Sequence, residues 1–163
     1  MYVSRNGEWN ALEILCQKLE SFETDPSNTI VVTVSPDYSA TVGMHVAHHL
    51  SKNGEMLPIK YIEVPYPDED VEIYKQKFLD SSSENSIHTY KDKKVILVEA
   101  GVISGKNYQW ITNYLKEATI PYITAALYEN VFSTYKSDAV GEYYNHNIRE
   151  LEFYWERHNN HWK

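Results

Sequence analysis

The sequence predicts an α/β fold, a single domain in which a mainly parallel sheet is flanked by helices. Short apolar segments of strand length alternate along the chain with amphipathic helical patterns, which is the order of βαβ units. One of these segments, residues 29–35, is β-branched almost throughout, as in strands that are buried on both faces. No repeat or linker rich in Pro or Gly divides the chain, so residues 1–163 are predicted to form one domain.

The first half of the chain contains two helix and two strand candidates. Apolar residues spaced three and four apart predict a helix over 9–22, and the β-branched run predicts a strand over 29–35. A turn at 36–41 leads into a second helix over 42–54, which ends near Gly54. A second strand is predicted at 58–64.

The second half begins with the longest irregular segment, residues 65–92. It is acidic at its start and has a short helical pattern at 71–79, and a loop of this length in a compact domain is expected to be functional or mobile. A strand at 95–98, a helix at 107–118 and a strand at 121–128 follow. Near the end, a short aromatic segment precedes a polar tail at 157–163.

Charge and cysteine content indicate the environment and exclude some partners. The formal net charge of −8 argues against nucleic acid or an anionic membrane as the main partner, since both require a basic surface. No apolar run approaches the roughly 18 residues that span a bilayer. The lone Cys16 fits a reducing compartment, and no leader pattern opens the chain, so a cytoplasmic location is expected.

The stretch from Lys93 to Ile111 contains a candidate phosphate loop. An apolar strand runs into Glu99, and a loop of small residues leads to a helix that begins near Lys106. The first amides of such a helix have no partners within it, and the positive end of the helix dipole favours an anion there. The candidate phosphate-binding residues are Gly101, Ser104, Gly105, Lys106 and Asn107.

An alternative interpretation of the same stretch is purely structural. Gly101 and Gly105 would then be turn residues, and Ser104 would be a helix cap. The Walker pattern and the dinucleotide-binding pattern are both absent.

This stretch resembles the phosphoribosyl-diphosphate (PRPP) signature of the type I phosphoribosyltransferases. In that family an apolar strand ends in two acids, and Asp-Thr-Gly-x-Thr then opens a helix. The closing half resembles the purine salvage branch, the xanthine/guanine/hypoxanthine enzymes, through Ala126-Leu127-Tyr128, Ser137-Asp138-Ala139-Val140-Gly141 and Phe153-Tyr154-Trp155-Glu156, which stand in matching order. The resemblance covers roughly residues 9 to 156.

The resemblance implies a fold, ligands and a mobile cover for the site. Segment 65–92 would be the family's hood over the active site, where Tyr66 and Tyr90 would close over a ligand. The implied partners are small molecules, namely a nucleotide, PRPP or another sugar phosphate. Apart from the resemblance, a homodimer is kept as one expectation for the assembly. Mg²⁺ is implied as a cofactor of an active enzyme, and no cofactor is implied otherwise.

The acidic part of the PRPP signature is altered in this chain. Glu99 keeps the first acid and is the catalytic candidate, but Ala100 replaces the second acid. Ile103 stands where the family carries the aspartate that acts on the nucleobase. Backbone amides can still hold a phosphate, whereas the ribose and its metal lose one carboxylate.

The two other ligand-binding regions of the family are altered as well. Its pyrophosphate loop often reads Ser-Arg-Gly-Gly, and the equivalent here is Ser35-Pro36-Asp37-Tyr38, in which an aspartate would repel diphosphate. The lysine that reads a purine oxygen would fall near Glu129 or Asn130, and the stacking aromatic near Glu150. The candidates for the base side are Tyr128, Tyr143, Phe153 and Trp155.

These residues leave two main functions open. The first is a diverged purine-type phosphoribosyltransferase with weak or altered activity. The second is a pseudoenzyme, a non-catalytic module that binds a nucleotide or sugar phosphate or a protein. A third hypothesis is a structural dimerisation subunit.

His45, His48 and His49 share helical spacing, but no acid or cysteine accompanies them at ligand spacing, so a surface or packing role is expected and no metal site is predicted.

Overall fold

The computed structural model describes residues 5–22, 24–34, 38–64, 71–84 and 86–145. The helices are α1 (Arg5–Glu20), α2 (Tyr38–His49), α3 (Val71–Leu79) and α4 (Lys106–Glu117), with a short 3₁₀ turn at Ile87–Tyr90. The strands are β1 (Thr29–Val34), β2 (Ile59–Ile62), β3 (Lys94–Val102), β4 (Tyr122–Asn130) and β5 (Ala139–Tyr144).

The five strands form one sheet in the order β2-β1-β3-β4-β5, and every neighbouring pair is parallel. This confirms the predicted α/β architecture. The chain moves from β1 outward to β2 and then returns to the other side of β1 as β3. In open parallel sheets, ligands bind beyond the carboxyl ends of the strands at such a switch point. The carboxyl ends of β1 and β3 are therefore the place to look for a site.

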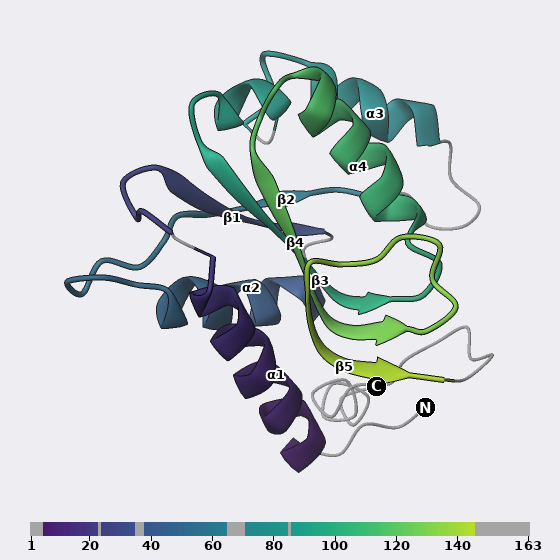
Figure 1. Cartoon of the computed structure of the whole chain (residues 1–163). Helices are drawn as coiled ribbons and strands as arrows, with labels where there is room; N and C mark the ends of the chain where they lie inside the picture. The colour runs from purple at the N-terminus through teal and green to yellow at the C-terminus, as the bar shows by residue number, and fades with distance from the viewer. Residues whose placement is uncertain (1–4, 23, 35–37, 65–70, 85, 146–163) are drawn as a thin grey trace, which may run out of the picture.

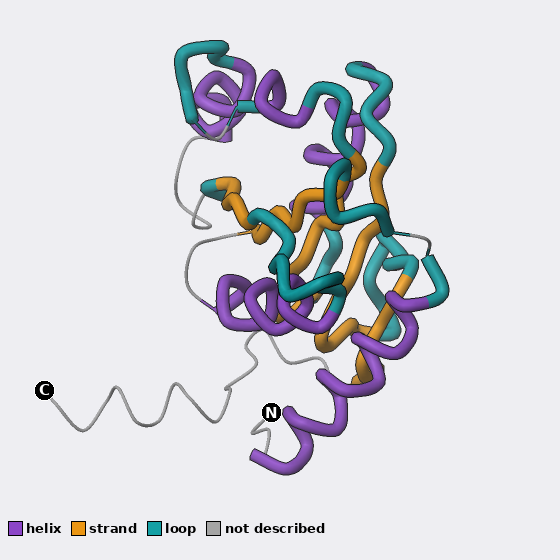
Figure 2. The backbone as a smooth tube through the Cα atoms, turned by 90° about the vertical axis from the view of Figure 1, so that its left-hand side faces the viewer, coloured by secondary structure: helices purple, strands orange, loops and turns teal. Residues whose placement is uncertain are grey.

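Helices cover both faces of the sheet. Helices α1 and α2 lie on one face and α3 and α4 on the other (Figure 1), and the sheet lies between these layers in the view of Figure 2. All six residues of β1 are buried, which confirms the prediction of a strand covered on both faces. The apolar core accordingly has two halves, one around Leu15, Val46 and Ile96 and the other around Phe78 and Leu115.

Helix α2 differs at both ends from the prediction. It begins at Tyr38, within the predicted turn, and it ends at His49 rather than near Gly54. The Ser39 hydroxyl, at its amino end, accepts a hydrogen bond of 3.0 Å from the N–H group of Ala100 in β3. This tertiary contact joins the first turn of α2 to the sheet, and sequence periodicity does not reveal it.

Strands β3 and β4 are longer than predicted. Strand β3 runs to Val102, so Glu99 and Gly101 lie inside the strand rather than in a loop. It remains extended because β4 also continues, with Gly101 opposite Tyr128 and Val102 opposite Glu129. The placement of Gly101 in the phosphate loop was therefore wrong, and the true turn contains only residues 103–105.

Strand β5 was not predicted as a strand. Its sequence, AVGEYY, contains a glycine and lacks a β-branched run. Parallel pairing with β4, together with the packing of α1 on β5, holds it in place. At its start, the Asp138 carboxylate accepts hydrogen bonds from the Thr124 N–H (2.8 Å) and hydroxyl (3.0 Å) groups of β4.

The described part of the predicted hood is packed against the sheet. Phe78 of α3 and Tyr90 are only 2% and 0% exposed, and the Phe78 ring contacts Tyr90, Trp110 and Tyr114. Tyr90 is therefore a core residue that does not close over a ligand, because its ring is needed to fill the layer between α3 and β3. Tyr66 and the tail at 157–163 lie outside the described residues.

The remaining candidates from the sequence have packing roles. The ring of His45 packs edge-on against Trp9 with centroids 5.2 Å apart, and His49 Nε2 lies 2.6 Å from Glu20 Oε1. Cys16 is buried between helix and sheet, and this burial raises the pKa of its thiol to about 11, so the group is inert at neutral pH. Across the described helices, none has the length and apolarity needed to cross a membrane.

We expect Gly141→Ala to destabilise the protein by about 2 kcal/mol or more, because α1 packs directly on β5 at this point. An added Cβ would lie 2.4 Å from Ala11 O and 2.6 Å from Leu127 O, and backbone atoms cannot move aside cheaply. Urea unfolding measures the change. Gly54→Ala is the control, since its site has a positive φ but no atom within 4 Å, and it should cost only about 1 kcal/mol. Equal losses in both variants would contradict this account of the α1–β5 contact.

Candidate functional site

The site candidate begins at the turn between β3 and α4, beside the switch point of the sheet. Residues 103–105 make the turn, and Gly105 caps α4 with φ 79° and ψ 5°. A residue with a side chain rarely adopts this left-handed conformation. Space is also lacking, since a Cβ at Gly105 would lie 2.5 Å from Tyr135 Cβ and 2.8 Å from Tyr135 N. Two separate constraints therefore require glycine at this position.

The amino end of α4 presents free N–H groups. Among the described residues, none accepts a hydrogen bond from the backbone N–H groups of Gly105, Asn107 and Tyr108. The N–H group of Lys106 makes only a long contact of 3.4 Å with Ser104 Oγ. Lys106 is exposed in the first turn, where the positive end of the helix dipole disfavours a cation. A bound anion would satisfy the amides and offset this repulsion.

Glu99 and Asn107, which the sequence named for separate roles, are in direct contact. Asn107 Nδ2 donates a hydrogen bond of 3.0 Å to Glu99 Oε1. Burial of the Glu99 carboxyl group raises its pKa to about 7, and the hydrogen bond from Asn107 lowers the pKa only in part. At neutral pH the protonated and ionised forms of this carboxyl group are thus both populated.

Tyr108 attaches the first turn of α4 to the sheet. It is fully buried, and its hydroxyl donates to Ala125 O at 2.7 Å and lies 3.3 Å from Leu97 O. Burial raises the pKa of this hydroxyl well above its ordinary value, so Tyr108 stays a neutral donor. Because Asn107 and Tyr108 are adjacent, this anchor also fixes the position of Asn107 relative to Glu99.

The crossover from β4 to β5, residues 131–138, packs on the β3–α4 turn. The N–H and Oγ1 groups of Thr134 both donate to Ser104 O, at 3.2 and 2.8 Å. Gln109 Nε2 of α4 donates to Thr134 Oγ1 at 2.9 Å. A segment some thirty residues away in sequence therefore holds the turn from behind.

A buried acid and a lysine lie at the carboxyl end of β4. Glu129 is 0% exposed, its Oε2 accepts a 2.8 Å hydrogen bond from Ser137 N, and its Oε1 lies 3.5 Å from Lys136 Nζ. Lys136 Nζ also lies 3.4 Å from Asn130 O. The sequence comparison expected a lysine at position 129 or 130 and found none. The crossover supplies an ammonium group at the same point, from six residues further along the chain.

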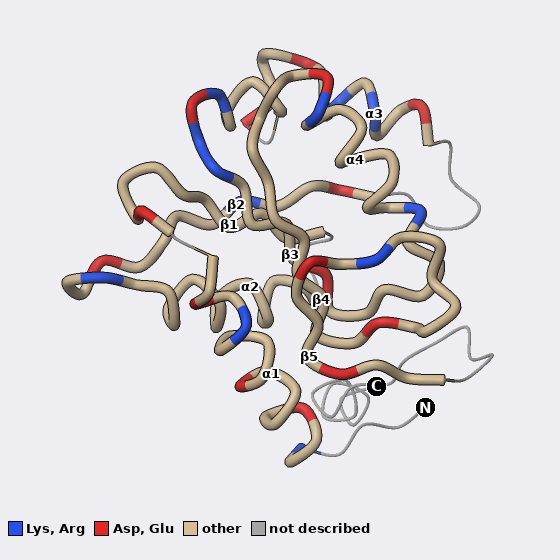
Figure 3. Tube along the Cα trace, viewed as in Figure 1, with Lys and Arg blue, Asp and Glu red and all other residues tan. Residues whose placement is uncertain are grey.

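Charged residues are unevenly distributed in this region. Figure 3 shows acidic positions on the three neighbouring strands β3, β4 and β5, where Glu99, Glu129 and Glu142 lie. Tyr144 of β5 lies opposite Asn130 in the β4–β5 pairing. Its pKa is raised, mainly by burial and to a smaller extent by Glu99, while a hydrogen bond with Asn130 acts in the opposite direction. Sequence reasoning did not include Asn130 or Tyr144 among the site residues. Recognition of β5 as a fifth strand would have pointed to this pairing.

The other predicted site residues are found in several places. Tyr143 is 52% exposed and lies opposite Glu129 in the β4–β5 pairing; its pKa is raised by burial and then by Glu129. Tyr128 is 1% exposed and packs in the core on the α1 side, so the structure does not bring it to Glu99. Tyr38 is the first residue of α2. Five candidates lie outside the described residues, namely Ser35, Pro36, Asp37, Phe153 and Trp155.

The two substituted positions of the signature have clear environments. Ala100, which the resemblance aligns with an acid, is 2% exposed in the core below α2. Ile103, which the resemblance aligns with an aspartate, is 38% exposed in the turn. An apolar side chain exposed there provides no proton donor or acceptor.

The donor set can be tested against a Mg²⁺ ion. In the described part of the chain, no three His, Cys, Asp or Glu side chains gather as a metal-binding group. At the turn, Glu99 is the nearby carboxylate, and one of its oxygens already accepts from Asn107. Such a set fits Mg²⁺ only when substrate phosphates and water provide most of the ligands, as is common for this ion.

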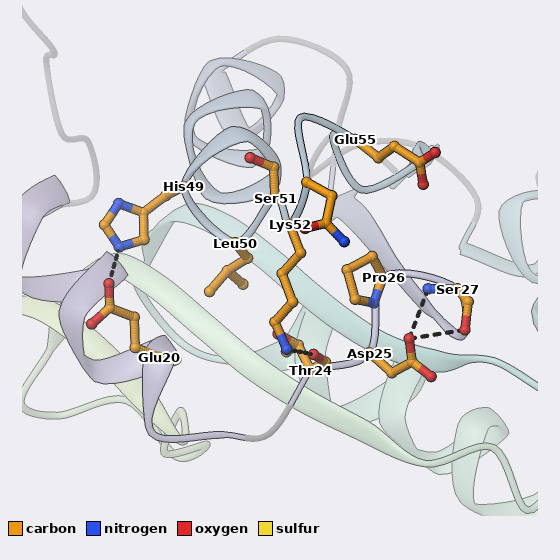
Figure 4. A pocket seen from close by; sticks show the side chains of 11 residues that line it. Glu20, Thr24, Asp25, Pro26, Ser27, His49, Leu50, Ser51, Lys52 and Glu55 are labelled. Atoms are coloured by element: carbon orange, nitrogen blue, oxygen red, sulfur yellow. Dashed lines mark hydrogen bonds and ion pairs between the residues drawn. The ribbon is translucent and has the colours of Figure 1, made fainter.

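A separate cavity of about 890 Å³ lies at the opposite edge of the sheet, near the amino ends of β1 and β2. Its polar side chains pair with one another or with the backbone (Figure 4): His49 with Glu20, Lys52 with Thr24 O, and Asp25 with Ser27. It shares no residue with the turn that precedes α4. The cavity is therefore separate from the candidate phosphate site.

No protein-family model and no curated protein sequence matches the chain. Several solved structures are similar to it. The xanthine-guanine-hypoxanthine phosphoribosyltransferase of Helicobacter pylori is 16% identical, with a TM-score of 0.63, and the match covers 99% of this chain and 96% of that one. An HGPRT-ase from Leishmania tarentolae in complex with GMP is 17% identical, with a TM-score of 0.54 over 92% and 91%. A hypothetical protein from Neisseria gonorrhoeae with bound ppGpp is 13% identical, with a TM-score of 0.67 over 98% and 93%.

Identities this low establish the fold alone. The chain is a single α/β domain with the fold of the purine phosphoribosyltransferases, as its sequence predicted.

We expect Glu99→Gln to stabilise the protein at pH 8 by on the order of 2 kcal/mol, with little effect at pH 5. The folded-state pKa of about 7 lies above the ordinary glutamate pKa of 4.5, so the folded protein retains a proton that the unfolded chain releases between these values. Stability from this group is therefore present below pH 4.5 and lost as pH rises through about 7. Glutamine cannot ionise, so the variant does not lose stability in this way. Urea unfolding at pH 5 and at pH 8 measures the free energy of unfolding of both proteins.

The matched control for this prediction is Glu84→Gln, which removes an exposed carboxylate from a surface turn. Its effect on stability should be small and similar at both pH values. If Glu99→Gln behaves in the same way, the carboxyl group of Glu99 is not the buried titrating group described above.

Proposed function

We propose that this protein binds a purine nucleotide through its phosphate group at the β3–α4 turn, as a phosphoribosyltransferase-like nucleotide-binding protein. The observation that carries the proposal is the set of N–H groups at Gly105, Asn107 and Tyr108, which have no acceptor among the described residues, with Lys106 beside them. These groups stand at the switch point of a fold whose known examples include proteins that hold GMP and ppGpp.

The phosphate-binding half of the signature supports ligand binding, whereas the acidic half gives little support for catalysis. The turn keeps Gly105 with the geometry that an anion-binding helix end requires. The acidic half keeps Glu99 but has Ala100 and Ile103 in place of acids. Loss of one preorganised charged group at a reacting centre costs about 3 kcal/mol, or roughly a hundredfold in rate. Binding is therefore the favoured function, and efficient transfer from PRPP is not.

A slow phosphoribosyl transfer is the second candidate function, and the state of Glu99 favours it. A carboxyl group with a pKa of about 7 can accept or donate a proton at neutral pH, which is the condition for general acid–base catalysis. A Mg²⁺ ion, brought with the substrate phosphates, would supply charge neutralisation. Glu99 would then act on the ribose hydroxyls or their water shell, and Lys106 would face the 5′-phosphate.

Calorimetric titration with GMP and guanosine tests the binding proposal. We expect GMP to bind, with an affinity that falls as salt rises, and guanosine to bind at least tenfold more weakly because it lacks the phosphate. Equal affinity for GMP and guanosine, or no binding of GMP, would show that the turn is not a phosphate site.

A pair of lysine variants tests where on α4 the anion binds. Lys106→Met should weaken GMP binding about tenfold, or by about 1.4 kcal/mol, because it removes a cation next to the phosphate. Lys116→Met is the matched control, since Lys116 is exposed in the last turn of the same helix and should leave the affinity unchanged. Equal losses in the two variants would indicate only a general charge effect.

Transfer activity is tested separately, by incubation with PRPP, Mg²⁺ and a panel of radiolabelled purine bases. A nucleotide product that disappears in Glu99→Gln would support the second candidate. Binding without product would support the non-catalytic module. The homodimer stays a prediction, which light scattering would test by a mass twice that of the single chain.

A further inference from the structure

We infer that Thr134 is a positioning residue that holds the Ser104–Gly105 peptide in the one orientation that presents the Gly105 N–H group to a phosphate. This inference rests on the proposed nucleotide binding at the turn. It adds a residue from the β4–β5 crossover to a site that otherwise consists of the β3–α4 turn and its neighbours.

Two donors of Thr134 bind the same carbonyl oxygen. Its N–H group lies 3.2 Å and its Oγ1 2.8 Å from Ser104 O, so both lone pairs of this oxygen are engaged. Gln109 Nε2 donates to Thr134 Oγ1 at 2.9 Å. Because that hydroxyl accepts from Gln109, its own proton is directed at Ser104 O. The three groups thus form a directed chain from α4 through the crossover to the turn.

Because the peptide bond is planar, the contact at Ser104 O also fixes the direction of the Gly105 N–H group. The described residues contain no cis peptide bond, and in a trans peptide the C=O and N–H groups point in opposite directions. With Ser104 O directed at the crossover, the Gly105 N–H group is directed away from it. Gly105 is buried, and its N–H group makes no hydrogen bond with the described residues. A buried amide requires a partner, and a bound anion would supply one.

The turn by itself does not exclude the opposite orientation. Gly105 has a φ of 79°, and glycine adopts negative φ values about as readily. Rotation of the peptide plane by half a turn would place Ser104 O where the N–H group had been, and a carbonyl oxygen at that point repels a phosphate. A residue outside the turn is needed to prevent this flip, and Thr134 makes the contacts that oppose it.

Thr134 is suited to a test because its hydroxyl is not part of the core. Thr134, Gln109 and Ser104 are all exposed residues, so removal of the hydroxyl opens no buried cavity. We therefore expect Thr134→Val, which keeps the size of the side chain, to melt within a few degrees of the unchanged protein. Thr134→Ser keeps the hydroxyl and serves as the conservative rescue.

The first readout is GMP affinity by calorimetry. Thr134→Val should bind GMP at least tenfold more weakly than the unchanged protein, and Thr134→Ser should bind within about twofold of it. Weak binding by the valine variant with recovery in the serine variant supports the inference. Equal binding by Thr134→Val and the unchanged protein overturns it.

The second readout reports the peptide orientation without any ligand. The dipeptide Ser-Gly occurs once in the sequence, at 104–105, so labelling with ¹³C-carbonyl serine and ¹⁵N-glycine yields one cross-peak from this peptide. We expect one sharp peak in the unchanged protein and in Thr134→Ser, and a second or exchange-broadened peak in Thr134→Val. The same single peak in all three proteins overturns the inference.

The two readouts separate failure of the inference from failure of the proposed function. If the unchanged protein does not bind GMP, the proposed function is wrong, and the cross-peak alone decides whether Thr134 fixes the peptide. If GMP binds but Thr134→Val affects neither its affinity nor the cross-peak, the proposed function stands and the inference is wrong.

Discussion

The turn between β3 and α4 can exist in its observed form only because residue 105 has no side chain. The crossover from β4 to β5 approaches so closely that a Cβ at Gly105 would lie 2.5 Å from Tyr135 Cβ and 2.7 Å from Ser133 Oγ. The same approach lets Thr134 reach Ser104 O. Close packing at Gly105 and the contact of Thr134 with Ser104 O thus have a single cause, the near approach of the crossover to the turn.

The electrostatics of the site follow from how strand β3 is covered. Strand β3 continues past the end of β1 and is paired by β4 on its other side, which places Glu99 in a largely desolvated position. Burial favours the neutral carboxyl group, and one hydrogen bond from Asn107 compensates only in part. The protein therefore keeps a carboxyl group that destabilises its folded state at alkaline pH. Retention of such a group is more usual at functional positions than at structural ones.

The positions that differ from the signature matter for side-chain chemistry and not for binding by backbone amides. Backbone amides can bind an anion whatever the side chains are, so the proposed phosphate site depends on Gly105 and its packing. Proton transfer and neutralisation of diphosphate depend on individual side chains, and Ala100 and Ile103 offer no charge, proton donor or proton acceptor. A change from transferase to nucleotide binding would need no alteration of the fold. A side-chain charge can also come from a different segment, since Lys136 of the crossover places its ammonium group 3.5 Å from Glu129 Oε1.

The order of helices and strands up to β4 and the doubly covered strand β1 could be predicted from the sequence, because they depend on local periodicity. Strand β5, the core position of Tyr90 and the clamp made by Thr134 could not. Each depends on a surface supplied by a distant segment: β4 and α1 for the strand, α3 and α4 for the ring, and the turn at Ser104 for the threonine. Local sequence determined which elements form, whereas tertiary packing decided which polar groups stay free to bind a ligand, because a hydrogen bond between remote segments leaves no pattern in either one.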